Sequence, residues 1–183
     1  MGYPTLRFSN WVANNTINYV MLQFKGLAHS SGVVVSAYID FYVFGTLPAS
    51  GTYTDIVDSY EIINPDISIK TCTWINRWEG LIAGIPSTLP WGNNTHNGAV
   101  QGVDYASTPF SSTVLSGSMV GSHIQMPLPT EIVQKWLATP SSNYGILMKL
   151  RNISATDQYI EFSSSDTVAP YESRRPQLVI NYI

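Results

Sequence analysis

Apolar and polar residues alternate along most of the chain, and a period of two is typical of strands with one buried face. Residues 33–44 (VVVSAYIDFYVF) form the longest β-prone run, and their β-branched and aromatic side chains favour a central strand. The alternation as a whole predicts strands at residues 19–24, 33–44, 55–63, 68–74, 114–115, 122–126, 144–150, 158–163 and 177–183.

One segment departs from this period. Thr130 is suited to cap a helix, Pro140 ends the segment, and the apolar residues between them recur at helical spacing: Ile132, Val133, Trp136 and Leu137. A parallel sheet would need several crossover helices. The pattern therefore predicts an all-β fold, an antiparallel β-sandwich of the jelly-roll type with one short α-helix around residues 130–138.

Domain organisation is predicted to be simple. The 183 residues suit a single domain, 1–183, since the chain has neither an internal repeat nor a linker. Glycines and prolines are frequent from Gly80 to Thr113, which predicts a long irregular loop at about 80–113. A loop of this length either carries function or packs back across the sandwich.

Charged residues make up 11% of the chain, against about 25% in an ordinary soluble domain. The formal net charge of −3 argues against a nucleic-acid partner. Arg174 and Arg175 are the only adjacent basic pair, and we interpret them as a local salt-bridging corner rather than an anion site. The sequence predicts no membrane span and no secretory leader, so we expect synthesis in a host cytoplasm.

Five features resemble one family. In chain order they are a strand end at 71–77 (TCTWINR), a loop at 102–105 (GVDY), a helix at 131–137 (EIVQKWL), a strand at 143–149 (NYGILMK), and the closing pair 162–165 (FSSS) and 175–182 (RPQLVINY). Across residues 19–183, the chain thereby resembles the DNRLRE family, also seen as disaggregatase-related repeats and domains similar to carbohydrate-binding modules.

The resemblance implies a non-catalytic jelly roll of the kind found on extracellular polysaccharidases, cell-surface proteins and some virion proteins. It implies no particular ligand, because fold does not fix function. Members usually have one or two further strands before the one that matches 19–24. Only eighteen residues precede it here, so an edge strand is expected to be either shortened or supplied by a neighbouring copy.

Catalytic chemistry is not indicated. His29, His96 and His123 lack a second ligand at metal-binding spacing, and no Gly-x-Ser-x-Gly nucleophile motif is present. The carboxylates form no recognisable pair for glycoside hydrolysis. We expect no enzyme activity, no catalytic residue and no cofactor. A structural calcium ion bound by Asp55 and Asp58, or by Asp104, remains an alternative without further support.

The loop aromatics are the candidate contact residues. Sugars stack on exposed aromatic rings while amides and carboxylates bond their hydroxyl groups. The residues with this chemistry near the loop are Trp78, Trp91, Asn93, Asp104 and Tyr105. Alternatively, these rings fill the mouth of the sandwich or pack on a neighbouring subunit.

Two functions follow from these features. The first is a non-catalytic structural or interaction module on a particle surface, as in a phage virion protein that decorates a capsid or belongs to a tail. Its partners would be other virion subunits or copies of itself. The alternative is an extracellular or cell-surface carbohydrate-binding module that recognises a polysaccharide, or surface glycan, through the loop aromatics.

Overall fold

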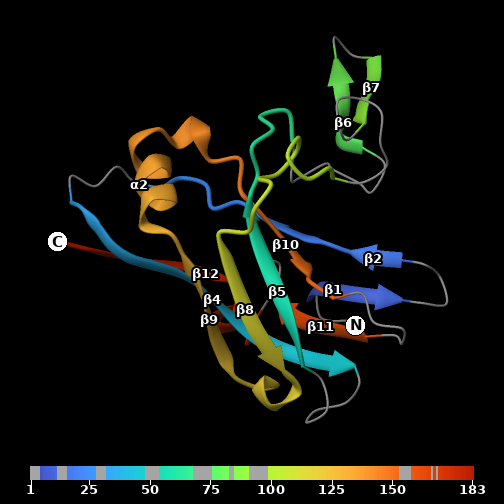
Figure 1. Cartoon of the computed structure of the whole chain (residues 1–183), viewed down its shortest axis with the longest axis vertical. Helices are drawn as coiled ribbons and strands as arrows, with labels where there is room; N and C mark the ends of the chain where they lie inside the picture. The colour runs from blue at the N-terminus through green and yellow to red at the C-terminus, as the bar shows by residue number, and fades with distance from the viewer. Residues whose placement is uncertain are drawn as a thin grey trace.

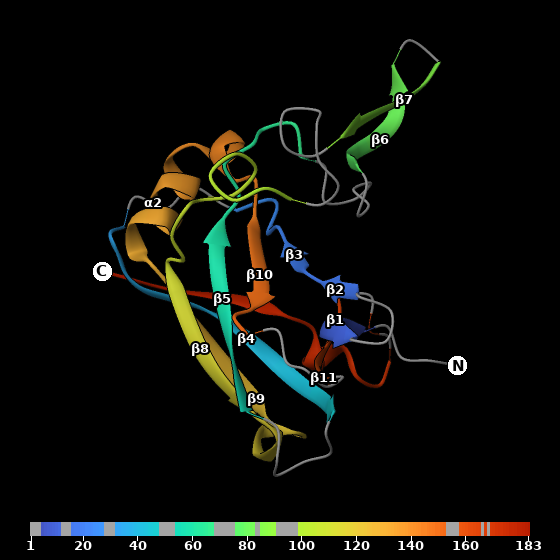
Figure 2. The ribbon, with the colours of Figure 1, turned by 45° about the vertical axis from the view of Figure 1, so that its right-hand side comes forward.

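The computed structural model describes residues 5–11, 16–27, 32–47, 54–67, 76–82, 85–90, 99–152, 158–165, 167 and 169–183. Two antiparallel sheets pack face to face, and a two-stranded hairpin lies apart from them in both views (Figures 1 and 2). The hairpin pairs β6 (Asn76–Ile82) with β7 (Ile85–Pro90). The predicted antiparallel β-sandwich is therefore confirmed.

The larger sheet has six strands in the order β12-β4-β11-β1-β2, with β9 on the other side of β4. Its strands are β1 (Thr5–Trp11), β2 (Thr16–Asn18), β4 (Val34–Leu47), β9 (His123–Leu128), β11 (Gln158–Ser163) and β12 (Gln177–Tyr182). The fourteen residues of β4 make it long enough to serve two partners in succession on one side, β12 up to Asp40 and β11 from Val43.

The smaller sheet has the order β3-β10-β5-β8, formed by β3 (Val20–Leu22), β10 (Ile146–Leu150), β5 (Thr54–Glu61) and β8 (Ser111–Ser116). Alternate residues of each strand face the larger sheet and build the main core, in which the rings of Phe41 and Phe162 lie 5.0 Å apart. The other residues form the outer face of the sheet. Every second position of a strand is thus committed to the core.

The predicted helix is confirmed as α2 (Thr130–Ala138). It packs against β4 and buries Val133, Trp136 and Leu137 in the main core. Thr130 is its first residue rather than its cap, since Pro129 occupies the cap position and makes no side-chain bond. Because Gln134 Oε1 accepts the Val34 amide at 3.0 Å, the helix also satisfies the first backbone donor of β4.

Three predictions need comment. The segment 68–74 lies outside the described residues. The chain itself supplies two early strands, β1 and β2, so the edge strand is not borrowed from a neighbouring copy. It is short, in agreement with the other alternative, because β2 at the edge of the larger sheet has three residues. The segment 80–113 is not irregular throughout, because it holds β7 and the start of β8. β7 tolerates its prolines because both strands of an isolated hairpin are edge strands.

Candidate functional site

Of the predicted contact residues, the structure describes the side chains of Asp104 and Tyr105 alone. Trp78 belongs to β6, but its side chain lies outside the described residues, as do Trp91 and Asn93. Asp104 and Tyr105 are both buried, and Tyr105 is only 3% exposed. The expectation that Tyr105 offers an open ring to a sugar therefore disagrees with the structure.

Asp104 fixes the loop that carries it. Its carboxylate accepts hydrogen bonds from Asn64 Nδ2 at 2.8 Å and from the Val100 amide at 2.9 Å. Its carbonyl accepts the amides of Ile63 and Asn64. A buried carboxylate is stable only when such donors surround it. Asp104 thus holds residues 100–104 against the end of β5 and acts as a structural residue here.

Tyr105 belongs to a closed cluster on the outer face of the smaller sheet, formed with Tyr19, Tyr60 and Lys149 and named here the tyrosine cluster. The Tyr60 and Tyr105 rings meet edge to face at 5.0 Å. Lys149 Nζ lies 5.0 Å from the Tyr60 centroid and donates to the Tyr105 hydroxyl at 3.0 Å. Burial raises the pKa of all three tyrosines above the ordinary value.

Asp58 lies beside this cluster, directly opposite Lys149 in the strand register. Arg151 bonds both of its carboxylate oxygens, at 2.9 and 2.6 Å, and the Ser112 hydroxyl donates at 2.6 Å. Burial alone would raise the pKa of Asp58, but these bonds from Arg151 and Ser112 outweigh it and lower that pKa. Both carboxylate oxygens of Asp58 are therefore bonded by neighbouring side chains.

The carboxylates considered for calcium do not converge. Asp55 and Asp58 lie on opposite faces of β5, since they are three residues apart in a strand. Asp55 accepts from Gln158 Nε2 at 2.7 Å, and Asp104 is occupied as described. In the described part of the chain, no three His, Cys, Asp or Glu side chains form a potential metal site. No described helix is long and apolar enough to cross a membrane.

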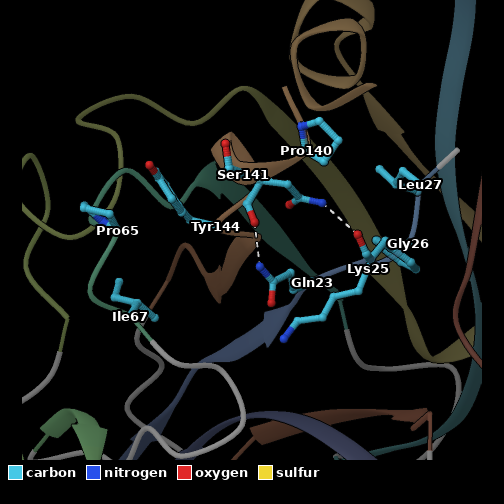
Figure 3. A pocket seen from close by; sticks show the side chains of 11 residues that line it. Gln23, Lys25, Gly26, Leu27, Pro65, Ile67, Pro140, Ser141 and Tyr144 are labelled. Atoms are coloured by element: carbon cyan, nitrogen blue, oxygen red, sulfur yellow. Dashed lines mark hydrogen bonds between the residues drawn. The ribbon is translucent and has the colours of Figure 1, made fainter. Parts of the chain in front are cut away.

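A pocket of about 350 Å³ lies at the end of the sandwich where β3 ends, and it is named here the end pocket (Figure 3). Its walls combine apolar and polar side chains: Gln23, Phe24, Lys25, Gly26, Leu27, Pro65, Ile67, Pro140, Ser141, Asn143 and Tyr144. Gly26 has a φ of 69°, a left-handed conformation that lets the chain turn at the rim. Asp104 bonds Asn64 and so positions the turn carrying Pro65.

Two hydrogen bonds join the pocket walls. Gln23 Nε2 donates to the Asn143 carbonyl at 2.5 Å, and Asn143 Nδ2 donates to the Phe24 carbonyl at 2.8 Å (Figure 3). Asn143 is 6% exposed, and its Oδ1 has no hydrogen-bond partner. The polar groups of Lys25, Ser141 and Tyr144 make no side-chain hydrogen bond within the described part of the chain. The pocket therefore retains capacity to bond a polar ligand.

A second feature lies at the C-terminal edge, defined by β12 with the exposed side chains of Val33, Val35, Tyr182 and Ile183. Val33 and Ile183 exchange backbone hydrogen bonds at 3.1 Å, so the start of β4 and the end of the chain lie side by side (Figures 1 and 2). Val33 is 62% exposed and Ile183 84%. Among the described elements, β12 pairs with β4 alone.

Neither the end pocket nor the C-terminal edge contains a contact residue that was predicted from the sequence. The pocket joins segments about 120 residues apart, and nothing in local composition indicates that Gln23 and Asn143 meet. The C-terminal edge is indicated only weakly by the sequence, since the one sign of it is that the strand β12 contains no charged residue. No protein-family model matches the chain, and no curated protein matches it.

Proposed function

We propose that the chain is a non-catalytic interaction module of a particle surface, a virion subunit that associates with further copies of itself. The C-terminal edge is the observation that carries this proposal. Open edge strands present unpaired amide and carbonyl groups, and proteins usually protect them with charges, prolines or bulges. The sequence of β12, QLVINY, contains neither a charge nor a proline, and its one register shift lies at its end, between Asn181 and Tyr182.

A second copy is the occupant that fits this edge best. Two β12 strands can pair antiparallel about a two-fold axis, so that one surface serves both partners. The exposed apolar side chains beside the strand would then be covered at the same contact. Because β12 and its neighbours Val33 and Val35 carry no charge, no like charges would be brought together.

The carboxylates of the two sheets support a structural rather than a catalytic role. Glu161 bonds Arg7, Glu61 bonds Lys135, and Asp58 bonds Arg151. Each of these carboxylates is thus engaged in an ion pair within the sandwich. The low charge of the chain and its resemblance to domains on virions support the particle setting, as a capsid decoration or tail accessory subunit.

Sedimentation over a concentration series tests the association. Val33→Lys should weaken self-association by about tenfold or more, because a buried ammonium is strongly disfavoured. Val114→Lys is the matched control, since Val114 is 55% exposed on β8 in the smaller sheet and should leave association unchanged. A monomer at all concentrations, or equal effects of the two substitutions, would contradict the proposal.

The end pocket favours a second candidate, a carbohydrate-binding module. Its proline and tyrosine rings beside amide, hydroxyl and ammonium groups match the chemistry of a saccharide. Ser141→Trp, at the exposed rim of the pocket, should abolish specific binding on a glycan array, whereas Ser118→Trp in another exposed turn should not. Absence of binding by the unmodified protein would reject this candidate.

Genes for capsid and portal proteins beside the gene for this chain would favour the virion subunit over the carbohydrate-binding module.

A further inference from the structure

Arg174 places its guanidinium over two tyrosine rings on the outer face of the larger sheet. Its guanidinium carbon is 4.3 Å from the Tyr42 centroid and 4.4 Å from the Tyr171 centroid. Tyr42 comes from β4, and Tyr171 directly precedes η4 (Glu172–Arg174), the short turn that carries the arginine. The turn comes close to Tyr42 because β12, which follows it, begins opposite Asp40, two residues before Tyr42 on β4.

Stacking occupies the two faces of a guanidinium and leaves the N–H groups at its edge available. Among the arginine side chains that the structure describes, Arg7 bonds Glu161, Arg151 bonds Asp58, and Arg175 bonds the Thr167 carbonyl. Arg174 alone has no side-chain acceptor among the described residues. The expectation that Arg174 and Arg175 form a salt-bridging corner is therefore wrong for this part of the chain.

The Asp40 carboxylate, on the same face of β4, is engaged by another residue. Asp40 Oδ1 bonds His123 Nδ1, and the Tyr42 and His123 rings meet edge to face with centroids 5.3 Å apart. Tyr42 thus contacts both Arg174 and His123, and Asp40 pairs with His123 rather than with Arg174. The two rings hold a charged, planar donor in place, so less conformational entropy is lost when an acceptor binds.

We propose that Arg174, Tyr42 and Tyr171 form a recognition site for the carboxylate of a sugar acid. A planar carboxylate accepts two parallel bonds from a guanidinium, and the half-exposed tyrosine rings provide apolar surface for a pyranose. The exposed Glu172 partly offsets the charges of Arg174 and its neighbour Arg175, and the small positive charge that remains suits a monoanion better than a phosphate dianion. The site precedes β12 and shares no residue with the C-terminal edge or with the end pocket.

Titration with glucuronate, followed by NMR of the arginine Nε–H and tyrosine ring signals, tests this site. We expect saturable shifts at Arg174, Tyr42 and Tyr171 with glucuronate, and none with glucose at the same concentration. Arg174→Lys retains the charge but loses the planar pair of donors, and should bind about tenfold more weakly. Arg174→Gln should not bind.

Lys25→Gln is the control for net charge, because it removes one cation from the end pocket instead. It should bind glucuronate as the unmodified protein does. Thermal unfolding of each variant confirms that it is folded. Unchanged binding in Arg174→Gln, equal binding of phosphate, or no shift at these residues up to millimolar glucuronate would overturn the proposal.

Discussion

Lys149 and Arg174 are both cations among tyrosine rings, yet their surroundings differ. Lys149, on the smaller sheet, donates to the Tyr105 hydroxyl, lies opposite Asp58 and is enclosed by two almost fully buried rings. Arg174, on the larger sheet, lies over two rings and has no side-chain acceptor among the described residues. Lys149, on the outer face of the smaller sheet, thus bonds a neighbouring side chain, whereas Arg174, on the outer face of the larger sheet, still has N–H donors available for a ligand.

This difference separates structural cations from cations available for recognition. An aromatic environment alone does not distinguish them, since both have one. The hydrogen-bond acceptors beside the cation do distinguish them. A buried cation needs such acceptors within the protein for stability, whereas at a recognition site the ligand supplies them. The open edge of β12 belongs to the same larger sheet. We therefore propose that the interacting side of the module lies on the larger sheet rather than at the predicted loop.

The largest expected effect is on the closed side, at Asp104. Asp104→Ala should reduce the free energy of unfolding by about 2–3 kcal/mol, because buried donors of Asn64 and Val100 lose their acceptor. Arg174→Met, on the open side, should cost less than about 1 kcal/mol. Urea unfolding measures both. Equal losses would remove the distinction between the two sides.

A smaller effect is expected at Asp58. Asp58→Asn should reduce the free energy of unfolding at pH 7 by roughly 1–2 kcal/mol, since the bonds from Arg151 and Ser112 weaken. The pKa of Asp58 is lowered in the folded protein, so its stabilisation is present above the unfolded pKa of about 3.9 and is lost as the pH falls through the folded pKa. Unfolding curves of the two proteins should converge in acid. A difference independent of pH would contradict this assignment.

The smallest effect concerns the tyrosine cluster. The positive charge of Lys149 partly offsets the burial that raises the pKa of Tyr19 and Tyr60. Lys149→Met should therefore raise the pKa of these two tyrosines further, and ultraviolet titration near 295 nm should show ionisation shifted to higher pH. Raised tyrosine pKa values stabilise the fold below the unfolded pKa of about 10, and this contribution is lost as pH rises beyond it. Tyr182→Phe, at the C-terminal edge, is the control and should leave the shifted ionisations in place.

Local patterns were sufficient to predict the elements. The strand at 158–163 and the helix at 130–138 coincide with β11 and α2, because each depends on a period that neighbouring residues define. The strands at the N-terminus and in the hairpin were missed. β1 is stabilised by β11, about 150 residues later, and no local window contains that partner.

Whether the candidate side chains are exposed depends even more on contacts between distant parts of the chain. Asp104 and Tyr105 have suitable chemistry for a ligand, but Asn64 and Lys149 turn them inward, and both partners are far away in the chain. The two adjacent arginines illustrate the opposite case. Their sequence indicated a salt-bridging corner, whereas the structure stacks Arg174 on Tyr42, more than a hundred residues earlier. Composition shows which groups are present, and only the fold shows which remain available.

Backbone hydrogen exchange at two protein concentrations tests the interacting edge most directly. Amides of β12 should become protected as concentration rises, because pairing with a second copy would bond the open side of the strand. Amides of β8, an edge strand of the smaller sheet, should exchange equally at both concentrations. Protection that appears at β8 instead, or that never changes at β12, would contradict the account.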